Sequence, residues 1–175
     1  AYYNRGIILY ELLRLDEAVD SYNKAISIKL DYAQAYSNLG NILTKLDKLY
    51  EAELNLRRAI DLKPNYAEAY CNLGVTLIQL NKYEEAKEIL KIAISLKHDF
   101  AEAHSNLGNV FKMLGKLEEA EISYKKAIAL KPDYAKAHSN LGGIYKDLGK
   151  LDEAKNSYLQ AISARPDYAE AHRYL

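Results

Sequence analysis

The sequence predicts an all-α fold, a solenoid in which helical hairpins are stacked one after another. The first observation is a period of 34 residues, followed by the glycines Gly6, Gly40, Gly74, Gly108 and Gly142. Two series of alanines share it: Ala18, Ala52, Ala86, Ala120 and Ala154, and Ala25, Ala59, Ala93, Ala127 and Ala161. The second observation is helical spacing of apolar residues inside each period, and the third is a turn-forming residue midway through it. Self-similarity at such a period is the signature of repeat proteins.

The period divides the chain into five units that form a single array over residues 1–175. The units are 1–32, 33–66, 67–100, 101–134 and 135–168, and residues 169–175 open a sixth. Since the chain starts without Met and ends in "AEAHRYL", which resembles the start of another unit, we expect it to be a fragment of a longer protein.

Each unit is expected to contain two antiparallel helices. In the fourth unit, helical spacing relates Ala101, His104, Leu107, Phe111 and Leu114, and then Leu117, Ala120, Tyr124, Ala127 and Ile128. The residues expected to turn the chain between the two helices, in the left-handed conformation, are Asp47, Asn81, Gly115 and Gly149. Prolines that close a unit are Pro64, Pro132 and Pro166.

The first helix of each unit has an apparent capping signal. The expected N-caps are Asp31, Asn65, Asp99, Asp133 and Asp167, and the partners three residues on are Gln34, Glu68, Glu102 and Glu170. The recurring glycine lies inside this helix, where it costs about 0.5–1 kcal/mol relative to alanine. We expect close approach to the alanines of the second helix to offset that cost.

Composition narrows the class of function. The 24 basic residues balance 24 acidic ones, which argues against nucleic acid or an anionic membrane as the partner. No apolar run reaches the ~20 residues of a spanning helix, and no signal peptide is visible. Cys71 is the only cysteine, so no internal disulfide can form, and a cytoplasmic location is the natural expectation.

These residues resemble the tetratricopeptide repeat. The resemblance rests on the 34-residue helix-turn-helix period, the recurring "LG" that ends at Gly40, Gly74, Gly108 and Gly142, the aromatics Tyr22, Tyr124 and Tyr158, and the alanines and prolines above. The units look most like those of O-linked N-acetylglucosamine transferases and of long bacterial tetratricopeptide proteins. The resemblance implies a right-handed superhelix whose first helices line a concave groove that binds a peptide or protein segment.

An asparagine series follows the repeat: Asn4, Asn38, Asn72, Asn106 and Asn140. An amide side chain can pair with the N–H and C=O groups of any extended peptide, and small neighbours would let the peptide approach. The residues expected to line the groove are Ser37, Asn38, Asn41, Lys45, Asn72, Ser105, Asn106, Asn109, Lys112, Ser139 and Asn140. The alternative is that the asparagines bind a neighbouring repeat and stabilise stacking.

Other candidate sites are weaker. His104, His138 and His172 lie a whole repeat apart, too far to share a metal, and we expect neither a metal nor another cofactor. No nucleophile with a base and no phosphate-binding loop is visible, so catalysis is not expected. Tyr3, Ile7 and Tyr10 fall on the inner face as candidate walls of side-chain pockets, unless they pack on a preceding repeat.

Two functions remain open. The first is a peptide-binding module, as part of a larger protein. The second is an assembly scaffold that associates through its repeat ends or outer helices, with end-to-end self-association as the expected behaviour.

Overall fold

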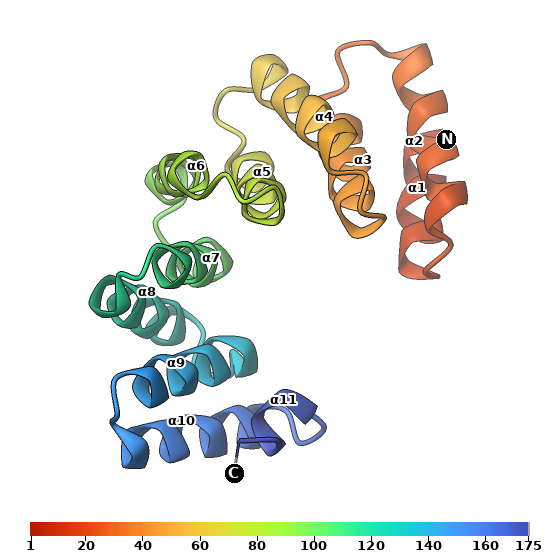
Figure 1. Ribbon diagram of the computed structural model, residues 1–175. Helices are drawn as coiled ribbons and strands as arrows, with labels where there is room; N and C mark the ends of the chain where they lie inside the picture. The colour runs from red at the N-terminus through yellow and green to blue at the C-terminus, as the bar shows by residue number, and fades with distance from the viewer. Residues whose placement is uncertain (175) are drawn as a thin grey trace. The chain divides into compact units, whose positions relative to one another are not determined.

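The structure, a computed structural model, describes residues 1–174, and every regular element in this part of the chain is a helix (Figure 1). The helices are α1 (Tyr2–Glu11), α2 (Leu15–Ile28), α3 (Ala33–Lys45), α4 (Leu49–Leu62), α5 (Ala67–Gln79), α6 (Tyr83–Leu96), α7 (Ala101–Met113), α8 (Leu117–Leu130), α9 (Ala135–Asp147), α10 (Leu151–Ala164) and α11 (Ala169–His172). The predicted all-α class is confirmed.

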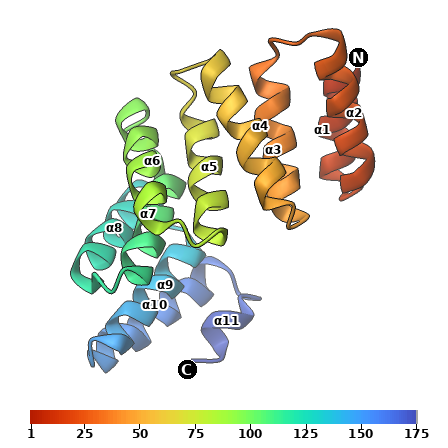
Figure 2. The same cartoon turned by 45° about the horizontal axis from the view of Figure 1, so that its top comes forward.

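The helices pack in sequential hairpins within two compact units, Ala1–Leu96 and the part from Lys97 onward. In the first unit, α1, α3 and α5 pair with α2, α4 and α6, and the hairpins touch through α2 with α3 and α4 with α5 (Figure 2). In the second unit, α7 pairs with α8 and α9 with α10, and α8 contacts α9. The inner helices also meet, α3 with α5 and α7 with α9.

The turn inside each hairpin is a left-handed residue, as predicted. The φ angles are 59° at Asp47 and at Asn81, and 73° at Gly115 and at Gly149. The chain then closes with a backbone bond, as from Lys48 N–H to the Leu43 carbonyl at 2.9 Å. The first hairpin places Leu13 in the same conformation with φ 58°, a turn that the sequence did not signal because leucine rarely adopts it.

The predicted side-chain caps are wrong. The N-cap residues of α3, α5, α7, α9 and α11 are the aromatics Tyr32, Tyr66, Phe100, Tyr134 and Tyr168, and none makes a side-chain cap bond. The aspartates lie one residue too early: Asp133, for example, accepts the Ala135 N–H through its backbone carbonyl at 2.9 Å. Instead, a cation of the preceding loop covers each aromatic ring, as Lys63 Nζ does 4.7 Å from the Tyr66 ring centre.

The recurring glycine faces a large side chain of the second helix, not the expected alanine. A Cβ on Gly108 would lie 2.7 Å from the Tyr124 ring, and one on Gly40 would lie 2.5 Å from Leu56 Cγ. The corresponding neighbour is tyrosine in the first, fourth and fifth hairpins and leucine in the second and third. The absence of a side chain makes room for this residue, which is fully buried at Leu56 and at Tyr124.

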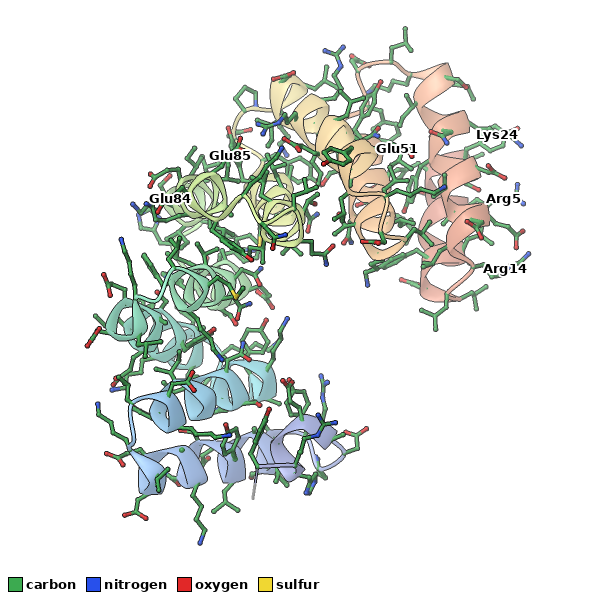
Figure 3. The ribbon with its side chains drawn as sticks, viewed as in Figure 1. Arg5, Arg14, Lys24, Glu51, Glu84 and Glu85 are labelled. Carbon is green, nitrogen blue, oxygen red and sulfur yellow. The ribbon has the colours of Figure 1, made fainter. Side chains whose placement is uncertain are left out.

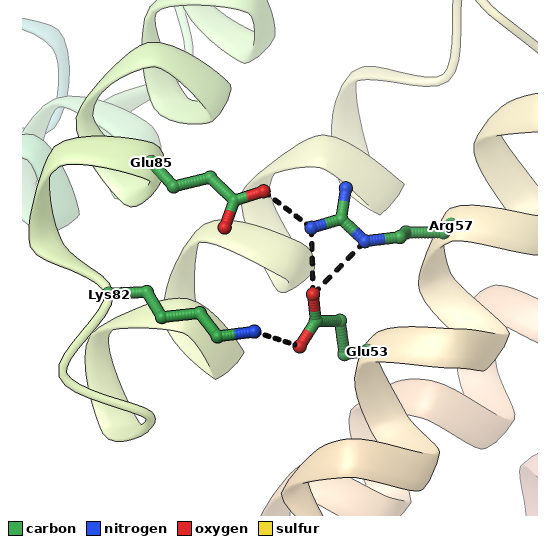
Figure 4. Close-up of polar contacts among 4 residues, drawn as sticks. All are labelled: Glu53, Arg57, Lys82 and Glu85. Atoms are coloured by element: carbon green, nitrogen blue, oxygen red, sulfur yellow. Dashed lines mark hydrogen bonds and ion pairs between the residues drawn. The ribbon is translucent and has the colours of Figure 1, made fainter.

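The second helices carry charges on their outer surface, as Figure 3 shows for Glu51 on α4 and for Glu84 and Glu85 on α6. A four-residue ion cluster joins α4 to the third hairpin (Figure 4). Arg57 donates to Glu53 at 2.7 Å and to Glu85 at 2.5 Å, and Lys82 donates to the other oxygen of Glu53 at 2.8 Å.

Two repeats later, Glu121 holds the register of Glu53. It lies 2.6 Å from Lys125 and 3.6 Å from Lys150. Stacked hairpins in both units are therefore joined by an acid of one second helix and a lysine of the next hairpin.

Candidate functional site

Asn38 binds the preceding hairpin. Its side-chain N–H groups donate to the Tyr3 hydroxyl at 3.3 Å and to the Tyr22 hydroxyl at 3.2 Å. Its amide oxygen accepts no hydrogen bond from a described residue. Burial is the main reason that the pKa of Tyr22 rises to about 12, and the nearby charge of Glu11 adds to it, while the bond with Asn38 acts in the opposite direction.

A second polar cluster joins α7, α8 and α9. The hydroxyl of the buried Tyr124 donates to Asn109 Oδ1 at 2.7 Å, and Asn140 donates to the same oxygen at 2.9 Å. Asn140 is therefore attached to the hairpin before it, as Asn38 is. At both places the stacking role that sequence reasoning kept as an alternative is present.

Asn41 and Asn72 occupy the same repeat positions as Asn109 and Asn140, but on α3 and α5. The second helix of their hairpin has Leu56 where the later one has Tyr124, so no phenol hydroxyl is present. Neither side-chain amide makes a hydrogen bond with a described residue. Both are half-buried, and their polar atoms remain available to another molecule.

The serines of the predicted groove do not line a surface. Ser37, Ser105 and Ser139 are 1%, 0% and 4% exposed, so the expectation that they admit a peptide is wrong. Tyr66, which directly precedes α5, forms a hydrogen bond with Ser37. The small residue at this position makes room for the following hairpin, and helical angle alone did not reveal that contact.

The predicted lysines are exposed. Lys45 Nζ lies 5.0 Å from the centre of the Tyr10 ring, and Lys112 Nζ lies 3.8 Å from the Asp147 carboxylate. Asn106 is half-buried on α7.

A pocket of about 300 Å³ lies between α1 and α3. Its lining residues are Ile7, Tyr10, Glu11, Tyr22, Asn38, Asn41 and Ile42. Two of the three predicted pocket residues, Ile7 and Tyr10, are among them, and the third, Tyr3, binds Asn38. Glu11 makes no hydrogen bond or ion pair with a described residue, and sequence reasoning did not single it out.

The histidines follow the end of the preceding repeat. Nε2 lies 2.8 Å from the Pro132 carbonyl oxygen in His138 and 2.7 Å from that of Pro166 in His172. Nε2 of His104 is buried without a full hydrogen bond, and burial lowers the pKa of this imidazole. Within residues 1–174, no group of His, Cys, Asp and Glu side chains is arranged to hold a metal.

No helix of the described chain combines the length and the apolar character needed to cross a bilayer.

Known protein families and structures match over nearly the whole chain. A family model described as TPR repeat matches residues 6–47, 40–80, 76–115 and 112–149, and one described as tetratricopeptide repeat matches residues 135–168. No curated protein sequence matches the chain.

Three solved structures are similar. TTC0263, a thermophilic TPR protein in Thermus thermophilus, is 28% identical over 99% of this chain and 95% of its own, with a TM-score of 0.87. MamA is 25% identical over 94% and 96%, with a TM-score of 0.77. YrrB, described as a TPR protein with an unusual peptide-binding site, is 25% identical over 98% and 89%, with a TM-score of 0.72.

Proposed function

The chain belongs to the tetratricopeptide-repeat family, whose fold generally mediates protein–protein interaction, and we propose that its inner helices bind an extended peptide or protein segment. The observation that carries the proposal is the pair of uncommitted amides, Asn41 and Asn72, on the neighbouring helices α3 and α5. Each can donate to a peptide carbonyl and accept from a peptide N–H, which reads main chain and not sequence.

The bound segment is expected to extend along one continuous array, the single domain proposed for residues 1–175. The amide oxygens of Asn38 and Asn140 add acceptors, since only their N–H groups are used within the protein. Asn106 occupies the same register on α7, and exposed Lys45 and Lys112 flank the asparagines. The described peptide-binding site of YrrB supports this type of function.

The likeness of the repeats to those of O-linked N-acetylglucosamine transferases supports a role as a substrate-recruiting arm in a larger, cytoplasmic protein. In that role the repeats bind and do not catalyse. The partner is a protein segment, with no part for nucleic acid, membrane or cofactor.

The test compares two matched double variants. Asn41→Ala/Asn72→Ala removes amides without partners in the described structure, whereas Asn109→Ala/Asn140→Ala removes a pair that joins two hairpins. A peptide selected on the wild-type chain from a random library serves as the probe. The first variant is expected to keep the wild-type melting temperature and to lose at least about tenfold in affinity, because each lost bond to a buried peptide group costs roughly 1–3 kcal/mol. The second is expected to melt earlier because it loses the bonds between hairpins.

Full affinity in Asn41→Ala/Asn72→Ala would contradict the proposal. In that case the alternative, assembly through the repeat ends, gains weight. Ile8 and Leu12 on the outward side of α1 are 56% and 60% exposed, whereas Ile42, in the register of Ile8, is 1% exposed. Arg5, in the register of Leu39, points to solvent on the same hairpin (Figure 3). Sedimentation of the same samples over a concentration range detects such assembly.

A further inference from the structure

The pocket between α1 and α3 has the size of one long side chain. Its volume of about 300 Å³ is at the small end of the range for ligand sites, roughly 300–1,000 Å³. Ile7 and Ile42 give it apolar walls, and Tyr10 and Tyr22 add aromatic ones. A chain of methylene groups can therefore be buried in it, provided that the polar end of the occupant meets a suitable partner.

The polar atoms that face the pocket are mainly acceptors. The Glu11 carboxylate is exposed and has no partner among the described residues. The N–H groups of Asn38 are directed to Tyr3 and Tyr22, which leaves its amide oxygen for a ligand. The amide of Asn41 is also unbound, so its oxygen can accept as well.

A cation already lies against one wall of this pocket. Lys45 Nζ is 5.0 Å from the centre of the Tyr10 ring, within the ~6 Å range of a cation–π contact. Lys45 is exposed, so an incoming cation can displace it at little cost. The same lysine opposes the entry of a second positive charge, which makes it a useful reporter.

The next contact along the unit differs at the corresponding positions. On α3, Lys45 holds the register of Glu11 and Thr44 holds that of Tyr10. The buried Thr44 hydroxyl lies 2.8 Å from the Thr76 hydroxyl and closes this contact. The acidic, aromatic pocket thus belongs to the contact of α1 with α3 and marks one place along a bound segment.

We infer that this pocket receives a cationic side chain, arginine or lysine, of the bound segment, with its stem against Ile7 and Tyr10 and its charge beside Glu11. The inference rests on the proposed function. It adds a sequence preference to a surface whose asparagines otherwise read the main chain alone.

The test uses nonapeptide pools with the central position fixed as arginine, lysine, norleucine or glutamate and the other positions filled by neutral residues. Binding is followed by the side-chain amide resonances of Asn38 and Asn41. The arginine or the lysine pool is expected to bind about tenfold or more tightly than the norleucine pool, as charge-assisted hydrogen bonds do. Comparing these two pools identifies the preferred cation.

Three variants sharpen the result. Glu11→Gln keeps the shape of the pocket and is expected to abolish the preference for a cation, while Lys45→Met is expected to increase it. Glu51→Gln removes an acid of the same charge from the outer helix α4 and is expected to leave the preference unchanged.

Two failures are distinguishable. If the norleucine pool binds as tightly as the cationic pools, or if Glu11→Gln keeps the preference, the pocket inference is wrong and peptide binding stands. If no pool binds, the proposed function fails and the pocket inference fails with it.

Discussion

Two pairs of asparagines occupy the same repeat positions but make different contacts. Asn109 and Asn140 are bonded to each other at 2.9 Å, and Tyr124 donates to the shared oxygen. Asn41 and Asn72 make no side-chain bond with a described residue, and Leu56 stands where Tyr124 does. The residue on the second helix, under the recurring glycine, distinguishes the two contacts.

The comparison shows that a repeated asparagine does not have one repeated role. Where a tyrosine hydroxyl is available, it fixes the amide oxygen, and the amides then join two hairpins. Where leucine replaces tyrosine, the packing is kept but the polar anchor is lost, and the amides stay available. Stacking and ligand binding are therefore distributed among the repeats.

The largest expected effect comes from displacing the anchor. Gly108→Ala places a Cβ 2.7 Å from the Tyr124 ring, which must shift and lose its bond to Asn109. We expect unfolding free energy to fall by about 3 kcal/mol, from overpacking and the lost bond together. Gly40→Ala displaces Leu56, which makes no polar bond, and should cost about 1 kcal/mol less. Denaturant unfolding of both variants measures the difference; equal losses would show that the hydroxyl does not anchor the hairpins.

An intermediate effect is expected from exchanging the two residues. Tyr124→Leu should cost about 1–2 kcal/mol, because the buried Asn109 oxygen loses a donor. Leu56→Tyr should change stability by less than about 1.5 kcal/mol, since tyrosine packs under the glycine in other hairpins. It should also join Asn41 to Asn72 and weaken peptide binding. Slower hydrogen exchange of the two side-chain amides would report the new bond, and unchanged exchange would exclude it.

The smallest effect is expected at the ion clusters of the second helices. Burial raises the pKa of Glu53, but hydrogen bonds from Lys82 and Arg57 outweigh it, so the pKa is lowered. A lowered folded-state pKa gives stability that is present above the unfolded value of about 4.3 and lost as the pH falls through the folded value. Glu53→Gln should cost about 1 kcal/mol at neutral pH and flatten the acid loss.

Glu121→Gln is the matched variant in the second unit and should cost less, because its lysine contact with the next hairpin is longer, 3.6 Å against 2.8 Å. Thermal melts between neutral and acidic pH check both variants. A larger loss at Glu121 would reverse the ranking of the two clusters.

Much of the local structure could be predicted from sequence, because it depends on residues close together in the chain. The helical spacing gave the hairpins, and Asp47, Asn81, Gly115 and Gly149 take the left-handed turn for which their types are suited. The caps failed because two local signals compete one residue apart, and the aromatic residue, covered by a cation of the loop, lies at the N-cap.

The period of the sequence by itself determined the all-α fold, the hairpin turns and the asparagine positions. Only the tertiary structure decided which of these asparagines are engaged and which small residues are buried. Ser37 and Asn38 are adjacent in the chain, but the following hairpin buries the serine and the preceding one binds the amide. The physical reason is that a residue's place on its own helix follows from sequence spacing, whereas burial and hydrogen bonding depend on side chains that other helices bring against it.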